Sequence, residues 1–168
     1  AIYIRRSDLR SDGGTTSTVP LLKFDEEKMR HVIVNMIDNA IKYTPKGSII
    51  VGCQIVSERE VISGGRTSDP TEVRPQAGGG TASPGGWVQV SVKDTGLGME
   101  PEDIAVLFQK FRRTSSANMR RREGEPIEGS GLGMHVAKMF VDKHGGRIWA
   151  ESPGRGKGST FYAALPLS

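Results

Sequence analysis

The stretch Met29–Pro45, MRHVIVNMIDNAIKYTP, is the part of the chain from which the fold is best deduced. At about 100° per residue it predicts one helix with two faces. Five apolar residues form a stripe wide enough to face a core, namely Met29, Ile33, Met36, Ile37 and Ala40. Asn35, Asn39 and Lys42 gather on the opposite side. Amide oxygens suit a hard cation such as Mg²⁺ and a lysine suits phosphate, so this side is either a metal–anion site or a solvated helix face.

Length and composition predict a single domain of 168 residues with an aliphatic core, because 36% of residues are hydrophobic but only 6% are aromatic. The net charge is +4, and arginines cluster between Arg112 and Arg122, which favours a local anionic partner over a nucleic-acid stripe. The single cysteine, Cys53, excludes an internal disulfide and is expected to be a small core residue. The sequence has no signal peptide and no apolar run long enough to span a membrane.

Periodicity along the first half predicts an edge strand over 2–5 and a helix from the N-cap Asp25 to about Tyr43. A half-buried strand over 48–56 follows, with Ile49, Val51, Cys53 and Ile55 on one face. Residues 57–86 are rich in Gly, Pro, Ser and Thr, so we expect a long, flexible hairpin connection there. Residues 87–93 alternate again and are expected to pair with the previous strand.

The second half predicts a short helix from Pro101 to about Phe108 and a mobile loop after it. Gly129–Gly133 open a second long helix whose apolar stripe is predicted to be Leu132, Val136, Met139 and Phe140. Two more strands are predicted over 147–151 and 159–165. Long helices interleaved with strands indicate an α+β fold with helices on one face of a mixed sheet and the other face partly open.

Two glycine-containing motifs bear directly on ligand binding. Asp94 ends a strand and precedes Gly96 and Gly98, so its carboxylate can accept a hydrogen bond from an adenine amino group, although an Asx turn explains the pattern equally well. Gly129, Gly131 and Gly133 lead into a helix, whose free N–H groups favour phosphate. No strand–glycine–helix unit or Lys-Ser/Thr pair accompanies them, which excludes the Rossmann fingerprint and the P-loop.

The order of these motifs is more specific than any one of them. Together with the Phe108–Phe111 pair and Gly156-Lys-Gly-Ser-Thr-Phe161, they resemble the catalytic ATP-binding domain of sensor histidine kinases, over roughly residues 24–167. This family belongs to the GHKL ATPases, with gyrase, the MutL repair proteins and a heat-shock chaperone. Asn39–Pro45 and His144–Ile148 resemble histidine kinases in particular. The resemblance implies a two-layer α/β sandwich of the GHKL (Bergerat) type, with residues 112–130 as a flexible ATP lid.

The resemblance also implies a role for each matching residue, with ATP and Mg²⁺ as cofactors. Asn39, helped by Asn35, would bind Mg²⁺, Lys42 would contact phosphate, and Tyr43 would lie near the nucleotide. Asp94 would bind adenine, with Gly96 and Gly98 shaping the pocket and Thr160 near the base. The phosphates would be enclosed by Gly129, Gly131, Leu132 and Gly133. Arg113 would reach the γ-phosphate, and Asp38 stands where the family usually has an acid.

The sequence lacks the phosphoacceptor histidine motif that the resemblance leads us to expect. None of His31, His135 and His144 has the His-acid-x-x-x-Pro context of a phosphoacceptor. The resemblance therefore implies that the phosphate goes to a histidine on a separate dimerisation domain and then to a response-regulator aspartate. The isolated domain is expected to be monomeric and cytoplasmic, and its initial Ala suggests a piece of a longer, possibly membrane-anchored, protein.

Three alternatives share the same fold. An anti-sigma serine kinase should lack the Lys-Tyr-Thr-Pro and His-Gly-Gly strings, which this chain has. A non-catalytic nucleotide-binding module is disfavoured by the intact Asn39, Asp94 and glycines. An ATPase that closes a dimer would need a long transducer domain after residue 168.

Overall fold

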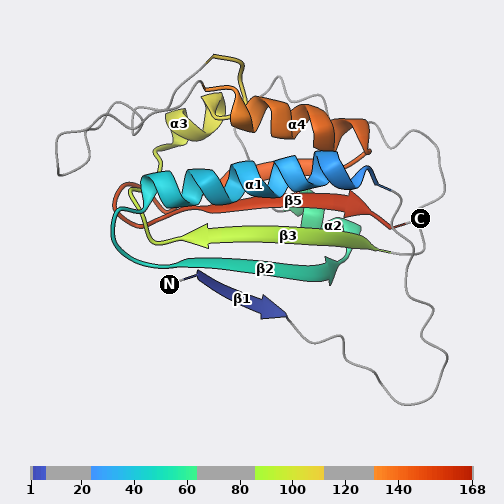
Figure 1. Ribbon diagram of the computed structural model, residues 1–168, viewed down its shortest axis with the longest axis horizontal. Coiled ribbons are helices and arrows are strands. Elements are labelled where there is room, and N and C mark those ends of the chain that lie inside the picture. The colour runs from blue at the N-terminus through green and yellow to red at the C-terminus, as the bar shows by residue number, and fades with distance from the viewer. Residues whose placement is uncertain (1, 7–23, 64–85, 112–130, 168) are drawn as a thin grey trace.

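The computed structural model describes residues 2–6, 24–63, 86–111 and 131–167, with only the backbone for the first range. Five strands form one mixed sheet in the order β1-β2-β3-β5-β4 (Figure 1). The strands are β1 Ile2–Arg6, β2 Ile49–Val56, β3 Trp87–Asp94, β4 Arg147–Glu151 and β5 Thr160–Pro166. β1 runs parallel to β2 at one edge, as predicted for an edge strand, and the other neighbours are antiparallel.

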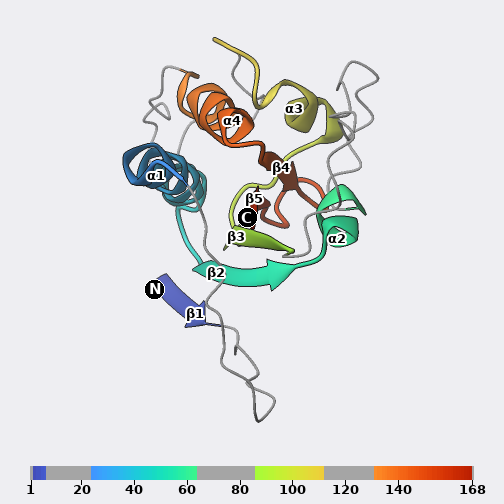
Figure 2. The same ribbon diagram turned by 90° about the vertical axis from the view of Figure 1, so that its right-hand side faces the viewer.

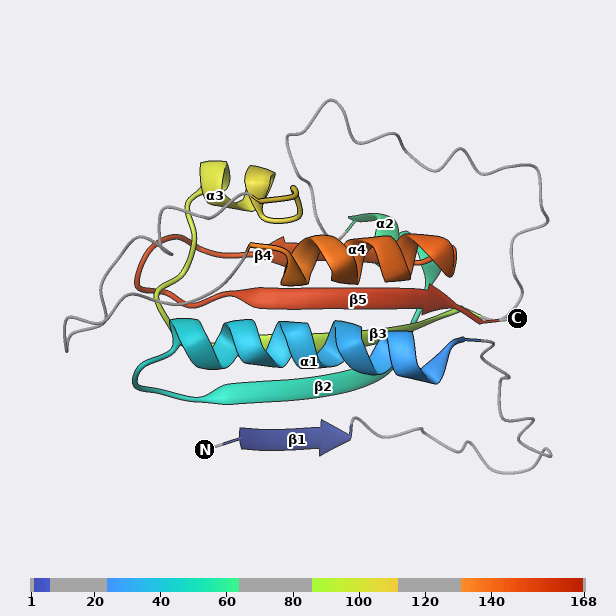
Figure 3. The same ribbon diagram turned by 45° about the horizontal axis from the view of Figure 1, so that its top comes forward.

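Four helices accompany the sheet, namely α1 Glu26–Tyr43, α2 Glu58–Ser63, α3 Pro101–Val106 and α4 Gly133–Lys143. α1 and α4 lie side by side on one face of the sheet, and α2 lies on the opposite face (Figure 2). α3 lies near the start of α4 (Figure 3). The predicted α+β fold with an open sheet is thereby confirmed.

Helix α1 forms where the sequence predicts it. The Asp25 carboxylate accepts a hydrogen bond from the Lys28 backbone N–H at 3.1 Å and caps the helix. Pro45 comes two residues after the last residue of the helix. A proline disfavours helical backbone at the residue before it, here Thr44, so the helix ends at Tyr43. The buried stripe is Met29, Val32, Met36 and Ala40. It includes Val32 in place of the predicted Ile33 and Ile37, which are half-buried.

The main core lies between the helices and the sheet, where Val92, Ala150 and Phe161 pack beneath α1 and α4. Helix α4 is rotated from the prediction. Its buried residues are Met134, Ala137 and Val141, whereas Met139 is 44% exposed. The prediction was wrong because it grouped the largest apolar side chains, while the close packing of α4 against the sheet places the small Ala137 at the contact.

A second apolar cluster lies on the other face of the sheet, which we expected to be partly open. Val56, Val61, Trp149 and Ala164 are buried there, and the rings of Trp149 and Tyr162 stack with centroids 4.9 Å apart. Val61 belongs to α2, so the flexible connection predicted from residue 57 actually begins with a helix. The rest of that segment, residues 64–85, lies outside the described residues.

Two further contacts fix the ends of helices. Arg147 Nη1 donates to the carbonyl oxygens of Val61 at 3.0 Å and Ile62 at 3.2 Å, and thereby holds the last turn of α2 against the sheet. The His144 ring joins α1 to α4, because its Nε2 accepts the Asp25 N–H at 3.0 Å and its Nδ1 lies 2.7 Å from the Phe140 carbonyl oxygen. Since a carbonyl only accepts, Nδ1 carries the hydrogen.

The prediction for Cys53 was wrong. Cys53 is exposed on β2, on the part of the helix-facing side next to the edge strand β1. Ile55 on the same side is 47% exposed, which shows that the helices do not cover the end of this strand. Among the described helices, none is long and apolar enough to cross a membrane.

Candidate functional site

Asp94, at the end of β3, is the most buried carboxylate group of the predicted site, with 3% of its surface exposed. Its Oδ1 accepts two backbone N–H groups, Gly96 N at 2.8 Å and Ser159 N at 3.2 Å. Burial raises the pKa of Asp94 above the ordinary value of 3.8, and the two amides together with the nearby Thr44 hydroxyl oppose that shift. With Oδ1 occupied twice, Oδ2 is the oxygen left to bind a ligand.

The loop after Asp94 lies directly against the end of α1. Leu97 N donates to the Tyr43 carbonyl oxygen at 2.9 Å. A Cβ placed on Gly96 would stand 2.2 Å from the same oxygen, so only glycine allows this approach. The base-binding motif and the end of the Asn-bearing helix are therefore brought together by backbone contacts.

The turn over residues 152–158 is joined to the same loop. Gly156 N donates to the Leu97 carbonyl oxygen at 2.7 Å, and Gly158 N donates to the Gly96 carbonyl oxygen at 3.2 Å. The Ser152 hydroxyl accepts from Met99 N at 2.9 Å and donates to the Gly158 carbonyl oxygen at 2.8 Å. Two glycine-containing loops that are distant in sequence thus form one unit around Asp94.

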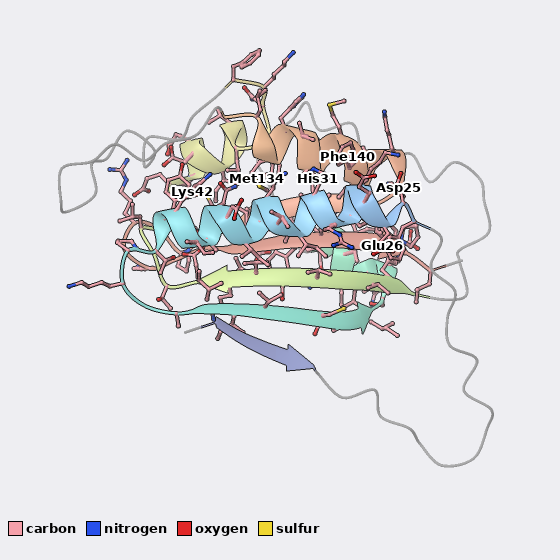
Figure 4. All side chains as sticks on the ribbon, in the orientation of Figure 1. Asp25, Glu26, His31, Lys42, Met134 and Phe140 are labelled. Carbon is pink, nitrogen blue, oxygen red and sulfur yellow. The ribbon has the colours of Figure 1, made fainter. Side chains whose placement is uncertain are left out.

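The start of α4 meets the polar side of α1. A Cβ on Gly133 would lie 2.8 Å from Asn35 Oδ1, so the asparagine side chain is directed at the first residue of α4. The N-cap residue Leu132 gives no side-chain hydrogen bond, in contrast to Asp25 on α1. Leu132 therefore does not cap the first N–H groups of α4 with its own side chain, and N–H groups at a helix start suit an anion. Lys42 lies at the end of α1, near the start of α4 where Met134 is labelled (Figure 4).

Most predicted residues are brought together by these contacts. Asn35, Asn39, Lys42 and Tyr43 are half-buried along the end of α1, whereas Asp38 is exposed. Gly96 and Gly98 lie in the loop after Asp94, whereas Gly131 and Leu132 directly precede Gly133, the first residue of α4. Phe108 packs against the main core, whereas Phe111 is 66% exposed. Arg113, Gly129 and the lid over 112–130 lie outside the described residues, so their roles stay predictions.

Thr160, which we expected near adenine, does not lie beside Asp94. The strand register places it opposite Lys93 and Glu151, and its hydroxyl lies beside Tyr162 on the other face of the sheet from Asp94. Ser159, one residue earlier, is buried and donates its N–H to Asp94. A shift of one residue reverses the face of a strand, so the motif alone did not fix which of the two residues lies beside Asp94. Sequence reasoning missed both Ser159 and Thr44.

The side chains present fit Mg²⁺ as part of a nucleotide complex. No cluster of three His, Cys, Asp or Glu side chains that could hold a metal occurs within the described ranges, so these side chains form no dedicated cage. The amide oxygens of Asn35 and Asn39 are hard donors, and protein-bound Mg²⁺ commonly keeps waters and substrate phosphates as its other ligands. This donor set therefore suits a metal that arrives with a nucleotide.

Comparison with known proteins agrees with this geometry. Residues 24–168 match the family model described as histidine kinase-, DNA gyrase B-, and HSP90-like ATPase. The sensor histidine kinase WalK of Bacillus subtilis is 32% identical over 145 residues, which cover 86% of this chain and 19% of WalK. The adaptive-response sensory kinase SasA of Synechococcus elongatus is 33% identical over 149 residues, covering 89% of this chain and 30% of SasA. The chain thus spans less than a third of the length of these relatives.

Solved structures give the same fold. The catalytic domain of the histidine kinase ThkA has a TM-score of 0.58 at 21% identity, with 99% of this chain and 80% of that chain covered. Full-length ShkA in complex with AMPPNP also has a TM-score of 0.58 at 21% identity, with 99% and 26% covered. From the family match, the shared motifs and this fold, the chain belongs to the histidine kinase-, DNA gyrase B- and HSP90-like ATPases, a family that binds ATP, and its relatives are sensor histidine kinases.

Proposed function

We propose that this domain binds Mg-ATP and transfers the γ-phosphate to a histidine on a separate helical dimerisation domain, from which a response-regulator aspartate receives it. The observation that supports this most strongly is that α1 contacts both other motifs: Tyr43 at its end contacts Gly96 of the Asp94 loop, and Asn35, about two turns earlier, contacts Gly133 at the start of α4. A purine at Asp94 and phosphates at α4 would then occupy one continuous site.

Each residue would act by positioning or by charge. Asp94 Oδ2 would accept a hydrogen bond from the adenine amino group, and Tyr43 would lie near the nucleotide. Lys42 and the α4 N–H groups would hold phosphate oxygens, while Arg113 would reach the γ-phosphate. Asn39, helped by Asn35, would hold Mg²⁺, which when bound would neutralise charge on the phosphates.

The transfer step needs no covalent intermediate on this chain. A nitrogen of the acceptor imidazole attacks the γ-phosphorus, the bond to the β–γ bridging oxygen breaks, and ADP leaves while the imidazole loses its ring proton. Phosphoryl transfer of this kind depends on alignment and electrostatic stabilisation. The segment 112–130 would act as the lid, and the domain would work in the cytoplasm, where ATP and response regulators are found.

The test combines this domain, γ-³²P-labelled ATP and the helical dimerisation domains of related sensor kinases. Label on the partner that is lost in acid but stable in base would support a phosphohistidine product. Acid-stable label would instead indicate serine transfer, and an absence of transfer despite ATP binding would favour a non-catalytic module. Asn39→Ala is the matched variant, since it should prevent transfer while the fold, followed by circular dichroism, remains.

A further inference from the structure

The Thr44 side chain has an unusual environment beside the proposed purine site. Its hydroxyl oxygen is shielded from solvent and has no hydrogen-bond partner of acceptable geometry in the part of the chain that the structure describes. A Cβ placed on Gly96 would lie 2.6 Å from this oxygen, so the hydroxyl rests on the backbone of the Asp94–Gly96 turn. A buried hydroxyl without a partner is destabilising, which calls for a functional explanation.

The groups around Thr44 limit the roles that its hydroxyl can have. Asp94 Oδ1 already accepts the N–H groups of Gly96 and Ser159, so Oδ2 is the oxygen able to take another donor. A threonine hydroxyl has one hydrogen to donate, and an ionised carboxylate only accepts. The Thr44 hydroxyl lies close enough to Asp94 to lower its pKa, against the effect of burial. Because the hydroxyl has no exposed surface, direct contact with a ligand is disfavoured.

We propose that Thr44 is a positioning residue for purine selection: when a purine binds, its hydroxyl turns to donate to the Asp94 carboxylate, which stabilises the charged form and directs Oδ2 at the exocyclic 6-amino group of adenine. This inference rests on the proposed nucleotide site and adds its selectivity. An ionised, fixed carboxylate accepts from a 6-amino purine and repels the carbonyl oxygen of a 6-oxo purine. Without the hydroxyl, Asp94 would be freer to rotate or to take up a proton, and the preference for the amino group would fall.

The test measures dissociation constants by titration calorimetry for ATP and for purine riboside 5′-triphosphate, which lacks the 6-amino group. Thr44→Val keeps the shape of the side chain and removes the hydroxyl. We expect it to weaken ATP binding about tenfold, equivalent to about 1.4 kcal/mol, and to change binding of the deamino analogue less than about twofold. Thr44→Ser should restore ATP binding, because it returns the hydroxyl.

Thr95→Val is the matched control in the same turn. The Thr95 hydroxyl accepts the Ser48 N–H at 3.0 Å and is exposed, so its loss should leave the ratio of ATP to analogue affinity unchanged. Thermal unfolding without nucleotide would establish that Thr44→Val folds, and Thr44→Ala would replace it if it does not. If Thr44→Val weakened the binding of both nucleotides equally, or did not weaken ATP binding, the proposed role of Thr44 would be wrong. The proposed function would still stand in that case, provided that the unmodified domain binds ATP. If the unmodified domain bound no ATP, both would fail.

Discussion

At the scale of single residues, Asp94 combines burial with a need for charge. Burial raises its pKa above 3.8, while acceptance of an adenine amino hydrogen requires the ionised form. We therefore predict that ATP affinity falls in acid at a higher pH than it would for an exposed aspartate. Calorimetric titration of ATP across a pH series would measure this fall. Asp94→Asn should show weak binding without an Asp94 titration, because its amide can present N–H groups to the amino group of the base.

The raised pKa of Asp94 affects the stability of the fold in the opposite direction from its effect on ATP binding. In the pH window between 3.8 and the raised native pKa, the folded state binds more protons at Asp94 than the unfolded state does. The contribution of Asp94 to the free energy of unfolding therefore decreases as pH rises through that window. Stability and nucleotide binding thus place opposite demands on this one carboxyl, which is what a residue selected for binding would show.

Two glycines of one turn allow a matched prediction. Gly156 and Gly158 have φ values of +73° and +74°, so alanine at either position costs about 1–2 kcal/mol in backbone strain. At Gly158 the added Cβ would also stand 2.1 Å from the Asp94 carbonyl oxygen, whereas at Gly156 it would meet nothing within 4 Å. Gly158→Ala should therefore lower the free energy of unfolding by about 1–3 kcal/mol more than Gly156→Ala and weaken ATP binding. Urea denaturation that gave equal losses would contradict this.

At the scale of elements, α2 and the cluster beneath it are the part that sequence reasoning did not anticipate. Val61 is 1% exposed and packs among aromatic residues of the sheet, while its neighbour Ile62 is 63% exposed. Val61→Ala should lower the free energy of unfolding by about 2 kcal/mol, and Ile62→Ala should change it by less than about 0.5 kcal/mol. Chemical denaturation followed by tryptophan fluorescence would measure both, since Trp149 reports on the cluster. Similar effects for the two variants would mean that α2 does not pack as described.

The sequence predicts some helices better than others. α1 was predictable because its cap, its apolar spacing and Pro45 agree with one another. α2 was not, because its six residues fall within a polar segment and its only buried side chain is Val61. The stripe of α4 was misplaced because periodicity does not tell whether Ala137 or a larger residue faces the sheet. At the site, motif order singled out Asp94, which is buried where the loops meet, but strand register placed Ser159 rather than Thr160 beside it, and no motif singled out Thr44.

At the scale of the whole molecule, nucleotide binding and folding are coupled. A ligand that binds only the folded state at a hundred times its dissociation constant adds about 2.7 kcal/mol to the free energy of unfolding. Mg-ATP at that excess should therefore raise the unfolding temperature by several degrees in differential scanning calorimetry, while Asp94→Asn should respond much less at the same concentration. A transition indifferent to Mg-ATP would count against the whole site, including the roles of Asn39 and Lys42.

The joined loops around Asp94 have a consequence for how a nucleotide would be received. Since Gly156 bonds to Leu97 and Gly158 bonds to Gly96 through main-chain hydrogen bonds before any ligand arrives, the purine would enter a preorganised pocket. The conformational entropy of that half of the site is lost when the chain folds, so little remains to be lost on docking. Adenosine should consequently bind with almost no rearrangement, and any ligand-driven ordering that a triphosphate adds would report on the phosphate end alone.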